Sequence, residues 1–374
     1  MQSKGEETAM RWRSIVLMIL VLASFVWSQS DNEEFRSTWV VVWDHAPFGN
    51  TPEENMAKID EIMDNHVEAN MNAILFQIRQ RGTAYYNSSY EPWGWRLNYT
   101  DPGYDPLEYA IEQAHARGLE LHAWFNTFHT ADTVAGSPVA EHPEWVCRDW
   151  NDVMMPAEFA LSPGLPEVRE YLVNVAMEVV NNYDIDGLHL DYIRWNEYSN
   201  LSPPEQTVFD ENSRPMDGIF EEDLAHLRDT NFDRYLYDIE HPYSAGIPAG
   251  WDSWEDYWRG SLNTFMIALH DSIQSQKPWV RLSVAALGKY KTGDNSGAWN
   301  GYHRVYQDAA LWFNEGYVEQ LTPMHYHWTT SGGFTDMLMN DWAPNIQPGI
   351  DAGRLYTVRP YSAQFETDRV WSRH

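Results

Sequence analysis

The stretch of sequence that decides the fold is Ile185-Asp-Gly-Leu-His-Leu-Asp191. A short apolar run that directly follows an amphipathic segment is typical of a β-strand preceded by a helix in a parallel sheet. Because side chains on a strand alternate between its two faces, Leu188 and Leu190 are expected to face the helices. His189 and Asp191 are then expected on the opposite face, which a closed parallel sheet turns toward its axis.

The same alternation of apolar strands and amphipathic helices extends from Phe35 toward the C-terminus, as expected for repeated βα units. Helices are expected to start at the capping box Thr51/Glu54 and at Asp105, Pro166, Ser253 and Tyr302. The expected strands are 37–43, 73–79, 119–126, 185–192, 280–287, about 320–327 and about 346–351.

This pattern predicts an α/β fold, a (β/α)8 TIM-type barrel. No eighth strand is evident before His374, so we expect the barrel to be truncated before that strand. Residues 29–374 are expected to form one glycosidase-like barrel domain. The polar segment at about 193–250 is expected to be a long excursion after the fourth strand, and long ordered loops are usually functional.

The N-terminus resembles a targeting segment. Arg11 and Arg13 precede an apolar run at 15–27 that is too short to span a bilayer. We therefore expect residues 1–28 to be a signal peptide and the mature protein to be exported, periplasmic or extracellular, and free of the membrane. An uncleaved membrane anchor is the alternative interpretation.

Composition narrows the set of partners. The 374-residue chain has 55 acidic and 25 basic residues, a formal net charge of -30, which disfavours binding to nucleic acid or to anionic lipid. The 19 Trp and 21 Tyr can fill a core, and they also suit a cleft in which flat rings stack on sugars. Cys147 is the single cysteine, so no intrachain disulfide can form.

Polar residues from three neighbouring strands are expected to converge at the C-terminal mouth of the barrel, where barrel enzymes place catalysis. Burying so many polar groups is costly unless they serve one another or a ligand. Satisfied core groups and a functional site are therefore the two interpretations, and convergence favours a site. The inward polar set is Arg79, His122, Asn126, His189 and Asp191.

Glycoside hydrolysis requires two carboxyl groups that flank a sugar. Asp191 is expected to be the nucleophile or charge stabiliser, kept ionised by Arg79 or His189. Glu91, in the aromatic loop after the second strand, is the provisional acid/base. Asp44 and Asp351 are the alternatives for that second carboxyl group.

A metal site is the competing chemistry. His325-Tyr-His327 has suitable spacing on the sixth strand, and His122 and His189 could join it. The first strand, however, lacks the paired His of metallohydrolase barrels. We therefore expect neither a metal nor another cofactor, and a metal-dependent hydrolase remains an alternative.

Several segments resemble the glycosyl hydrolase-like 10 family of bacterial envelope proteins, in order and with matching spacing from about Phe35 to Asp351. They include Asn72–Arg79, Glu91-Pro-Trp93, Gly103–Leu107, Gly118–Asn126, Leu161–Arg169, Asp186–Tyr192 and Pro323–Tyr326. Two positions depart from the family pattern: Met324 replaces a usual Gln, and residues 285–288 are Ala-Ala-Leu-Gly.

The resemblance implies a TIM barrel with a glycosidase-type site at Asp191, His122, Trp124, Asn126, Arg79 and Tyr326. Some family members are similar to enzymes that cut peptidoglycan strands stripped of their peptides, so bacterial cell-wall glycan is a candidate substrate.

Together these observations lead to the hypothesis of a glycoside hydrolase that cleaves a polysaccharide. The expected sugar-positioning residues are Arg79, His122, Trp124, Asn126, His189 and Tyr326, with Trp93 as a stacking platform. A barrel that binds carbohydrate without cleaving it is the alternative from a different class.

Overall fold

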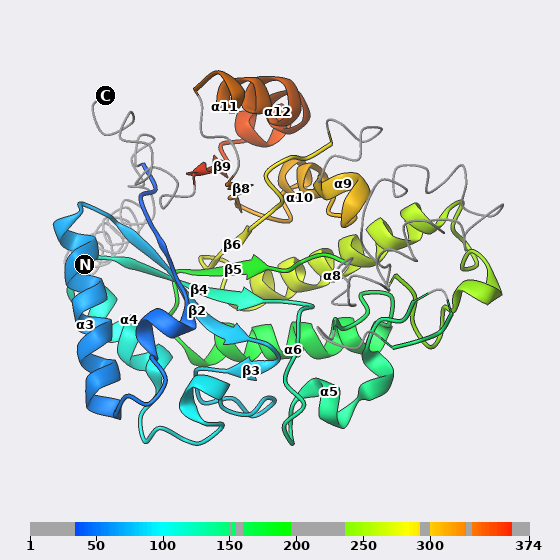
Figure 1. Ribbon diagram of the computed structural model, residues 1–374. Helices are drawn as coiled ribbons and strands as arrows, with labels where there is room; N and C mark the ends of the chain where they lie inside the picture. Colours follow the sequence, from blue (N-terminus) through cyan, green and yellow to red (C-terminus); the bar gives the residue numbers. More distant parts are fainter. Residues whose placement is uncertain are drawn as a thin grey trace, which may run out of the picture. The chain divides into compact units, whose positions relative to one another are not determined.

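The computed structural model describes residues 34–149, 151–154, 160–195, 236–291, 300–326 and 331–360. The chain divides into two compact units, Met1–Arg36 and Ser37–His374, and the fold described below is that of the second unit (Figure 1). The expected signal peptide at 1–28 and most of the excursion at 193–250 lie outside the described residues. Within the described ranges, no helix is long and apolar enough to cross a membrane.

Seven parallel strands form one curled sheet in which spatial order follows sequence order (Figure 1). They are β1 (Trp39–Val40), β2 (Ala73–Gln80), β4 (Glu120–Asn126), β5 (Gly187–Asp191), β6 (Arg281–Val284), β7 (Gln320–Leu321) and β9 (Leu355–Tyr356). The short β3 (Thr83–Ala84) pairs antiparallel with the end of β2, and β8 (Met324–His325) pairs with β10 (Arg359–Pro360). This order confirms the TIM-type barrel, and the described residues contain no eighth parallel strand in the main sheet.

Helices connect successive strands and cover the outside of the sheet, as βαβ crossovers require. The α-helices are α2 (Val42–His45), α3 (Pro52–Glu68), α4 (Pro106–Ala116), α5 (Pro138–Glu141), α6 (Pro166–Asn182), α8 (Trp254–Gln276), α9 (Gly301–Arg304), α10 (Ala309–Glu315), α11 (Ser331–Met337) and α12 (Ala343–Asp351). The described residues also contain three 3₁₀ turns, η1 (Trp95–Leu97), η2 (Pro143–Trp145) and η4 (Tyr243–Ala245), and one π-helical turn, η6 (Leu338–Trp342).

The helix starts follow the expected capping chemistry. The Thr51 hydroxyl accepts the Glu54 N–H while the Glu54 carboxylate accepts the Thr51 N–H, which is the predicted capping box. The Asp105 and Ser253 side chains accept backbone N–H groups in the first turns of α4 and α8, as simple N-caps. These caps fix where the long helices begin, and hence where the preceding loops end.

The main apolar core lies between the sheet and the helices. Leu188 and Leu190 of β5 belong to this core together with Leu172 of α6 and Phe265 of α8, as the strand alternation predicts. The opposite face of β5 therefore points toward the barrel interior.

Two of the strands predicted from the sequence differ in the structure. The expected seventh strand at 346–351 is part of helix α12, and the seventh parallel strand is β9, four residues later. Gly349 explains the difference, because a Cβ there would lie 2.3 Å from the Phe313 ring of α10. Close helix–helix packing selects the helix despite Pro348 within it. The first strand is also shorter than expected, since the chain turns into α2 at Val42.

Gly187 at the start of β5 is a stringent packing position. A Cβ added there would lie 2.1 Å from Nδ1 of His122 on the neighbouring strand. We expect Gly187→Ala to lower the free energy of unfolding by about 1–3 kcal/mol through overpacking. Urea denaturation measures this, with Gly332→Ala as the control because no atom lies within 4 Å of a Cβ at that position. Equal stability of the two variants would contradict the close contact.

Candidate active site

The carboxylate of Asp191 lies at the C-terminal end of β5, in register with Asn126 at the end of β4. The Asn126 side-chain oxygen accepts a hydrogen bond from Gln77 Nε2 at 3.2 Å, and Gln77 Oε1 accepts the Val42 N–H at 3.1 Å. Asp191 retains 7% of its surface exposed, and the two amide side chains are buried. Three strands, β2, β4 and β5, together with the start of helix α2, thus contribute to one polar layer at the mouth of the barrel.

An aromatic layer lies beneath these polar groups. The Trp39 ring contacts Trp124 at 5.7 Å, His189 at 5.4 Å and Tyr326 at 6.4 Å between ring centroids. The buried indole N–H of Trp124 has no hydrogen-bond partner within the described ranges, which is uncommon for a buried donor. Trp39 was not among the predicted site residues, although its position on the first strand could have indicated it.

His189 is held in one tautomer by two neighbours. The Trp39 indole N–H donates to His189 Nε2 at 2.9 Å, and His189 Nδ1 lies 2.8 Å from the Ser283 hydroxyl. Because Nε2 accepts a hydrogen bond, the ring proton resides on Nδ1 and the ring is neutral. His189 therefore orders the aromatic layer and does not supply the positive charge that we expected beside Asp191.

The backbone directly after Asp191 is strained. Tyr192 has φ of 49°, a left-handed conformation that is unfavourable for a bulky side chain. This turn lets the Tyr192 N–H donate to Asp191 Oδ1 at 2.7 Å, while the Asp191 carbonyl accepts the Thr127 N–H at 2.7 Å. The Arg194 guanidinium stacks on the Tyr192 ring at 4.5 Å. Such strain is concentrated at functional sites, so it marks the end of β5.

Arg79 does not lie in the mouth, contrary to the prediction. The register between β2 and β4 shifts after Gln77, so that Arg79 pairs with Phe125. This β-bulge breaks the alternation and turns Arg79 to the helix side, where its guanidinium stacks on the Phe125 ring at 4.7 Å. A bulge of this kind leaves no signal in the sequence pattern.

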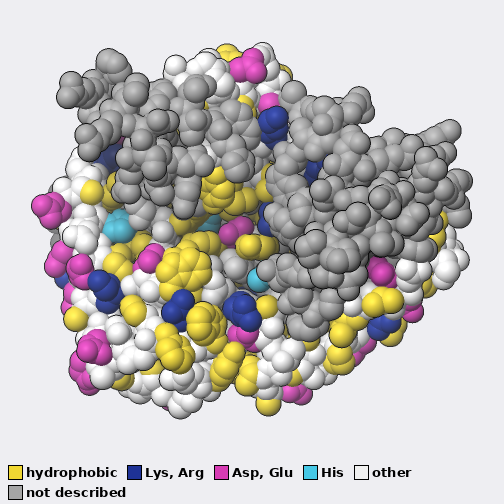
Figure 2. Space-filling model, viewed as in Figure 1, with side chains coloured by type: hydrophobic (Ala, Val, Ile, Leu, Met, Phe, Trp, Pro, Cys, Tyr) yellow, Lys and Arg dark blue, Asp and Glu magenta, His cyan; other side chains and the backbone are white. Residues whose placement is uncertain are grey.

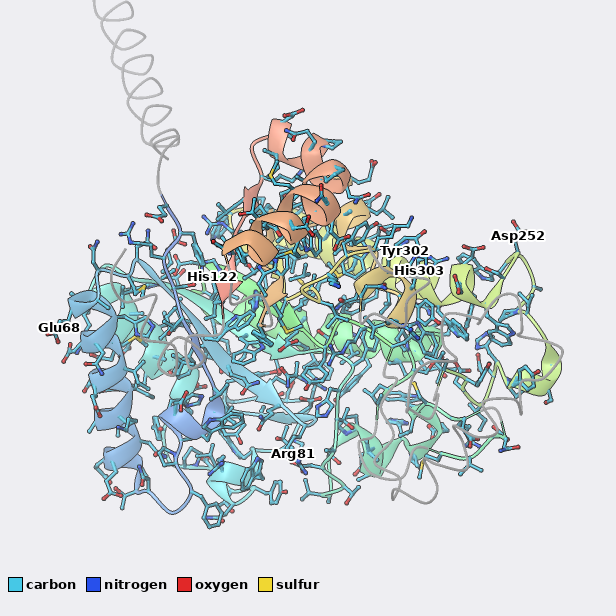
Figure 3. All side chains as sticks on the ribbon, turned by 45° about the horizontal axis from the view of Figure 1, so that its top comes forward. Glu68, Arg81, His122, Asp252, Tyr302 and His303 are labelled. Carbon is cyan, nitrogen blue, oxygen red and sulfur yellow. The ribbon has the colours of Figure 1, made fainter. Side chains whose placement is uncertain are left out.

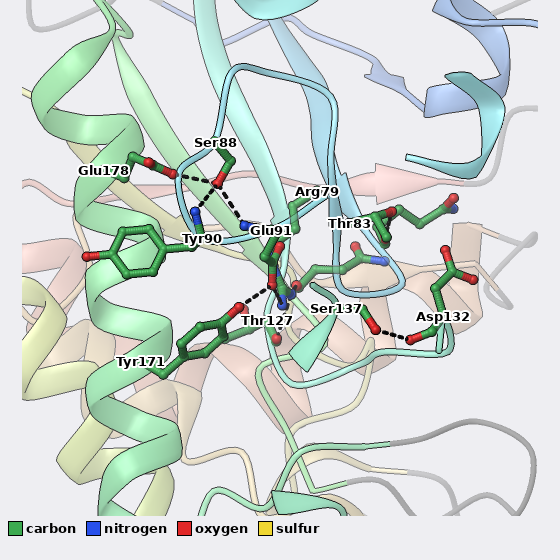
Figure 4. Close-up of polar contacts among 12 residues, drawn as sticks. Arg79, Thr83, Ser88, Tyr90, Glu91, Thr127, Asp132, Ser137, Tyr171 and Glu178 are labelled. Atoms are coloured by element: carbon green, nitrogen blue, oxygen red, sulfur yellow. Dashed lines mark hydrogen bonds and ion pairs between the residues drawn. The ribbon is translucent and has the colours of Figure 1, made fainter. Parts of the chain in front are cut away.

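Glu91 is the partner of Arg79 and is enclosed with it (Figure 4). Arg79 donates to the two carboxylate oxygens of Glu91 at 2.8 and 2.6 Å, and neither side chain has exposed surface. The hydroxyl of Tyr171 on α6 donates to the same carboxylate at 3.1 Å, and burial, followed by the Glu91 charge, raises the pKa of Tyr171. This placement argues against Glu91 as an acid/base that meets a substrate.

The pair also fixes the loop that supports the mouth. Arg79 Nη1 donates to the carbonyl oxygens of Asn126 and Thr127, the latter at 2.9 Å. Thr127 in turn donates its N–H to the Asp191 carbonyl. Arg79 and Glu91 therefore hold the segment 126–127 beside Asp191 from the helix side of the sheet.

His122 also lies away from the mouth. It pairs with Gly187 at the start of β5, four residues before Asp191, which corresponds to about 13 Å along the strand. Figure 3 shows His122 near the strand starts and Arg81 beyond the end of β2. Nε2 of His122 lies 3.0 Å from the Glu120 carboxylate, and burial lowers the pKa of His122. His122 faces inward, as the strand alternation predicts, but it lies in the layer at the strand starts and not at the mouth.

The remaining predicted residues divide between the interior and the rim. Trp124 and Tyr326 line the aromatic layer and Asn126 lies in the polar layer, as given above. Trp93 is half-buried and packs against a small apolar cluster that includes Val42 and Tyr85. These positions are consistent with a site around Asp191.

The predicted metal ligands that the structure describes do not form a cluster. His325 accepts or donates a hydrogen bond with Tyr356 at 3.2 Å, and burial lowers its pKa to about 4. His122 lies in the lower layer of the barrel, and His327 falls outside the described residues. In the part of the chain that the structure describes, no group of three or more His, Cys, Asp or Glu side chains could hold a metal ion.

Breaking the buried ion pair is expected to be costly. Glu91→Gln leaves the Arg79 guanidinium uncompensated in the core, so the free energy of unfolding should fall by about 3–5 kcal/mol. Glu61→Gln is the matched control, because Glu61 forms an exposed pair with Lys58 and should cost less than about 1 kcal/mol. Chemical denaturation of both variants measures the difference.

A double variant, Arg79→Met with Glu91→Met, is expected to recover part of the lost stability because it leaves no buried charge. Comparable losses for Glu91→Gln and Glu61→Gln would show that the Arg79–Glu91 pair is not enclosed as described.

Curated proteins are similar to this chain in sequence. Glycosyl hydrolase YngK of Bacillus subtilis (strain 168) is 28% identical over 371 residues, which cover 90% of this chain and 64% of YngK. Glycosyl hydrolase DigH of Escherichia coli (strain K12) is 25% identical over 321 residues, covering 79% of this chain and 63% of DigH. The chain thus spans just under two thirds of the length of these relatives.

The fold is also similar to that of a solved glycosidase. The glycoside hydrolase domain of PgaB (BpsB) from Bordetella bronchiseptica matches with a TM-score of 0.54 and 11% identity, over 87% of this chain and 84% of that domain. The family model described as glycosyl hydrolase-like 10 matches residues 34–361. The chain therefore belongs to the glycosyl hydrolase-like 10 family.

Proposed function

We propose that this protein hydrolyses glycosidic bonds in a polysaccharide, with the Asp191 carboxylate at the reacting centre. The supporting observation is the placement of Asp191 at the C-terminal end of β5, above the aromatic layer and beside the buried amides of Gln77 and Asn126. Membership of a glycosyl hydrolase-like family supports a glycosidase-type activity. Proposed roles follow from this placement.

Asp191 is proposed as the nucleophile or charge stabiliser of an oxocarbenium-like transition state. Its Oδ1 atom already accepts the Tyr192 N–H, which favours the ionised form. Asn126 is proposed to position a sugar hydroxyl, and Trp124 is proposed to support the sugar from the aromatic layer below.

The second carboxyl group is proposed to be Asp44 rather than Glu91. Glu91 is enclosed by Arg79 and Tyr171, as described above. Asp351 lies on the exposed end of α12, where it accepts a hydrogen bond from Gln347 at 2.8 Å. Asp44 is exposed on α2 directly after β1, at the same edge of the sheet as Asp191, and α2 is tied to that edge by the Val42–Gln77 bond.

An exported, periplasmic or extracellular location and bacterial cell-wall glycan as substrate are further parts of the proposal. The basic and apolar N-terminal segment at 11–27 supports export. The resemblance to envelope proteins supports a cell-wall glycan. A carbohydrate substrate, rather than nucleic acid or lipid, is also in keeping with the net charge of -30.

The carboxylate assignment is tested by substitution. Asp191→Asn and Asp44→Asn are each expected to reduce cleavage of a cell-wall glycan preparation by at least about 10²–10⁴-fold, as loss of a catalytic proton-transfer or charge-stabilising group does. Asp351→Asn is the matched control and should retain full activity. Product analysis by chromatography measures all three variants.

Undiminished cleavage by Asp191→Asn would overturn the assignment. Binding of glycan by the wild-type protein without any product would favour the non-catalytic carbohydrate-binding barrel instead.

A further inference from the structure

The loop after β2 carries a surface that differs from the rest of the chain. Residues 81–100 contain a single acidic residue, Glu91, in a chain with 55 acidic residues among 374. The Glu91 side chain is fully buried against Arg79, so this segment exposes no carboxylate. Arg81 and Arg96 are its two cations. Figure 2 shows hydrophobic side chains interspersed with Lys and Arg on the lower part of the face drawn, the part that β3 and α2 occupy in Figure 1.

Three side chains on this surface stack on one another, and we call them the aromatic platform: Phe48, Trp95 and Arg96. The rings of Phe48 and Trp95 are stacked with centroids 6.1 Å apart and an interplanar angle of 29°. The Arg96 guanidinium lies over the Trp95 ring at 4.1 Å. Phe48 is 59% exposed, so an apolar ring remains in solvent, at a hydrophobic cost that a ligand would remove.

The platform is held rigidly. Gly94 leaves no room for a side chain, since a Cβ there would lie 2.2 Å from the Tyr85 ring. The Tyr85 hydroxyl accepts the Arg96 N–H at 3.3 Å, and Gly94 donates its N–H to the Ala84 carbonyl at 2.8 Å. A rigid surface loses little conformational entropy on binding.

Two buried donors on the platform lack acceptors. The indole N–H of Trp95 and the Nε–H of Arg96 have no hydrogen-bond partner in the described part of the chain. Buried donors are almost always paired. Both nitrogens are shielded from solvent, so the flat rings, rather than these donors, match the apolar C–H face of a pyranose ring.

The platform is continuous with the edge that carries Asp191. Phe48 follows α2, whose first residue donates its N–H to Gln77, and Gln77 donates to Asn126 opposite Asp191. Trp95 belongs to the loop between β2 and α4. Both segments therefore begin at the C-terminal edge of the sheet, where a chain bound at Asp191 would extend across neighbouring βα loops.

We propose that Phe48, Trp95 and Arg96 form a distal subsite that binds pyranose units of a polysaccharide away from the scissile bond. The choice of ligand class rests on the proposed function. Stacking of the sugar on the exposed aromatic surface supplies the apolar contact. The subsite then increases affinity for long chains without taking part in bond cleavage.

The test uses binding, which does not depend on hydrolysis. Isothermal titration calorimetry of the full chain carrying Asp191→Asn, with hexamers of glucose, N-acetylglucosamine and galacturonic acid as probes, identifies the hexamer that binds best. Adding Trp95→Ala or Phe48→Ala should weaken its Kd about five- to tenfold, the loss expected for one stacked ring. Trp279→Ala is the matched control, because Trp279 is 66% exposed and lies before β6 at the opposite edge of the sheet.

Phe48→Ala is included because Phe48 is largely exposed, whereas Trp95 is half-buried and its replacement could disturb folding. Circular dichroism melts check that each variant is folded. Unchanged affinity in folded Phe48→Ala and Trp95→Ala variants, or binding of no hexamer, would overturn the subsite. Hexamer binding that depends on the platform, with no cleavage of any glycan by the wild-type protein, would support the subsite and reject the proposed function.

Discussion

The buried ion pair between Arg79 and Glu91 connects the loop after β2 with the strand ends beside Asp191. The arginine enters the layer between sheet and helices because a β-bulge turns it away from the barrel axis. There Arg79 donates to the Glu91 carboxylate and to the carbonyl oxygens of Asn126 and Thr127, and the Tyr171 hydroxyl donates to the same carboxylate. An ion buried in this way is tolerated only when its hydrogen bonds are satisfied, and this requirement fixes the loop after β2 relative to β4 and α6.

The ion pair supports both proposed functional regions, the mouth with Asp191 and the surface with the aromatic platform. At the mouth, the bonded carbonyls of Asn126 and Thr127 belong to the segment that holds the backbone of Asp191. On the surface, the loop anchored by Glu91 carries Trp95 and Arg96. One buried interaction thus orders the proposed reacting centre and the proposed distal subsite, and it does so without contacting a substrate.

Inside the barrel, imidazole groups lie in the lower layers and the Asp191 carboxylate lies at the top. The lower layer holds His122 against Gly187 and Glu120. Above it, the Trp39–His189–Ser283 chain uses both imidazole nitrogens and keeps that ring neutral. The carboxylate stands one layer higher, beside amide side chains and a strained tyrosine. The Asp191 carboxylate therefore lies where the strands end, above the layers that hold the two imidazole groups.

The sequence by itself determined the fold class and the strand carrying Asp191, because period-two alternation, helix caps and apolar runs are local properties. It also identified which face of β4 and β5 is inward, since Leu188 and Leu190 require an apolar environment. It did not determine the roles of Arg79 and Glu91, because a bulge changes register without changing composition. The depth of His122, the helical state of residues 346–351 and the grouping of Phe48 with Trp95 were likewise decided by contacts between segments distant in sequence. Packing distances and register are tertiary quantities, and a pattern within one segment does not contain them.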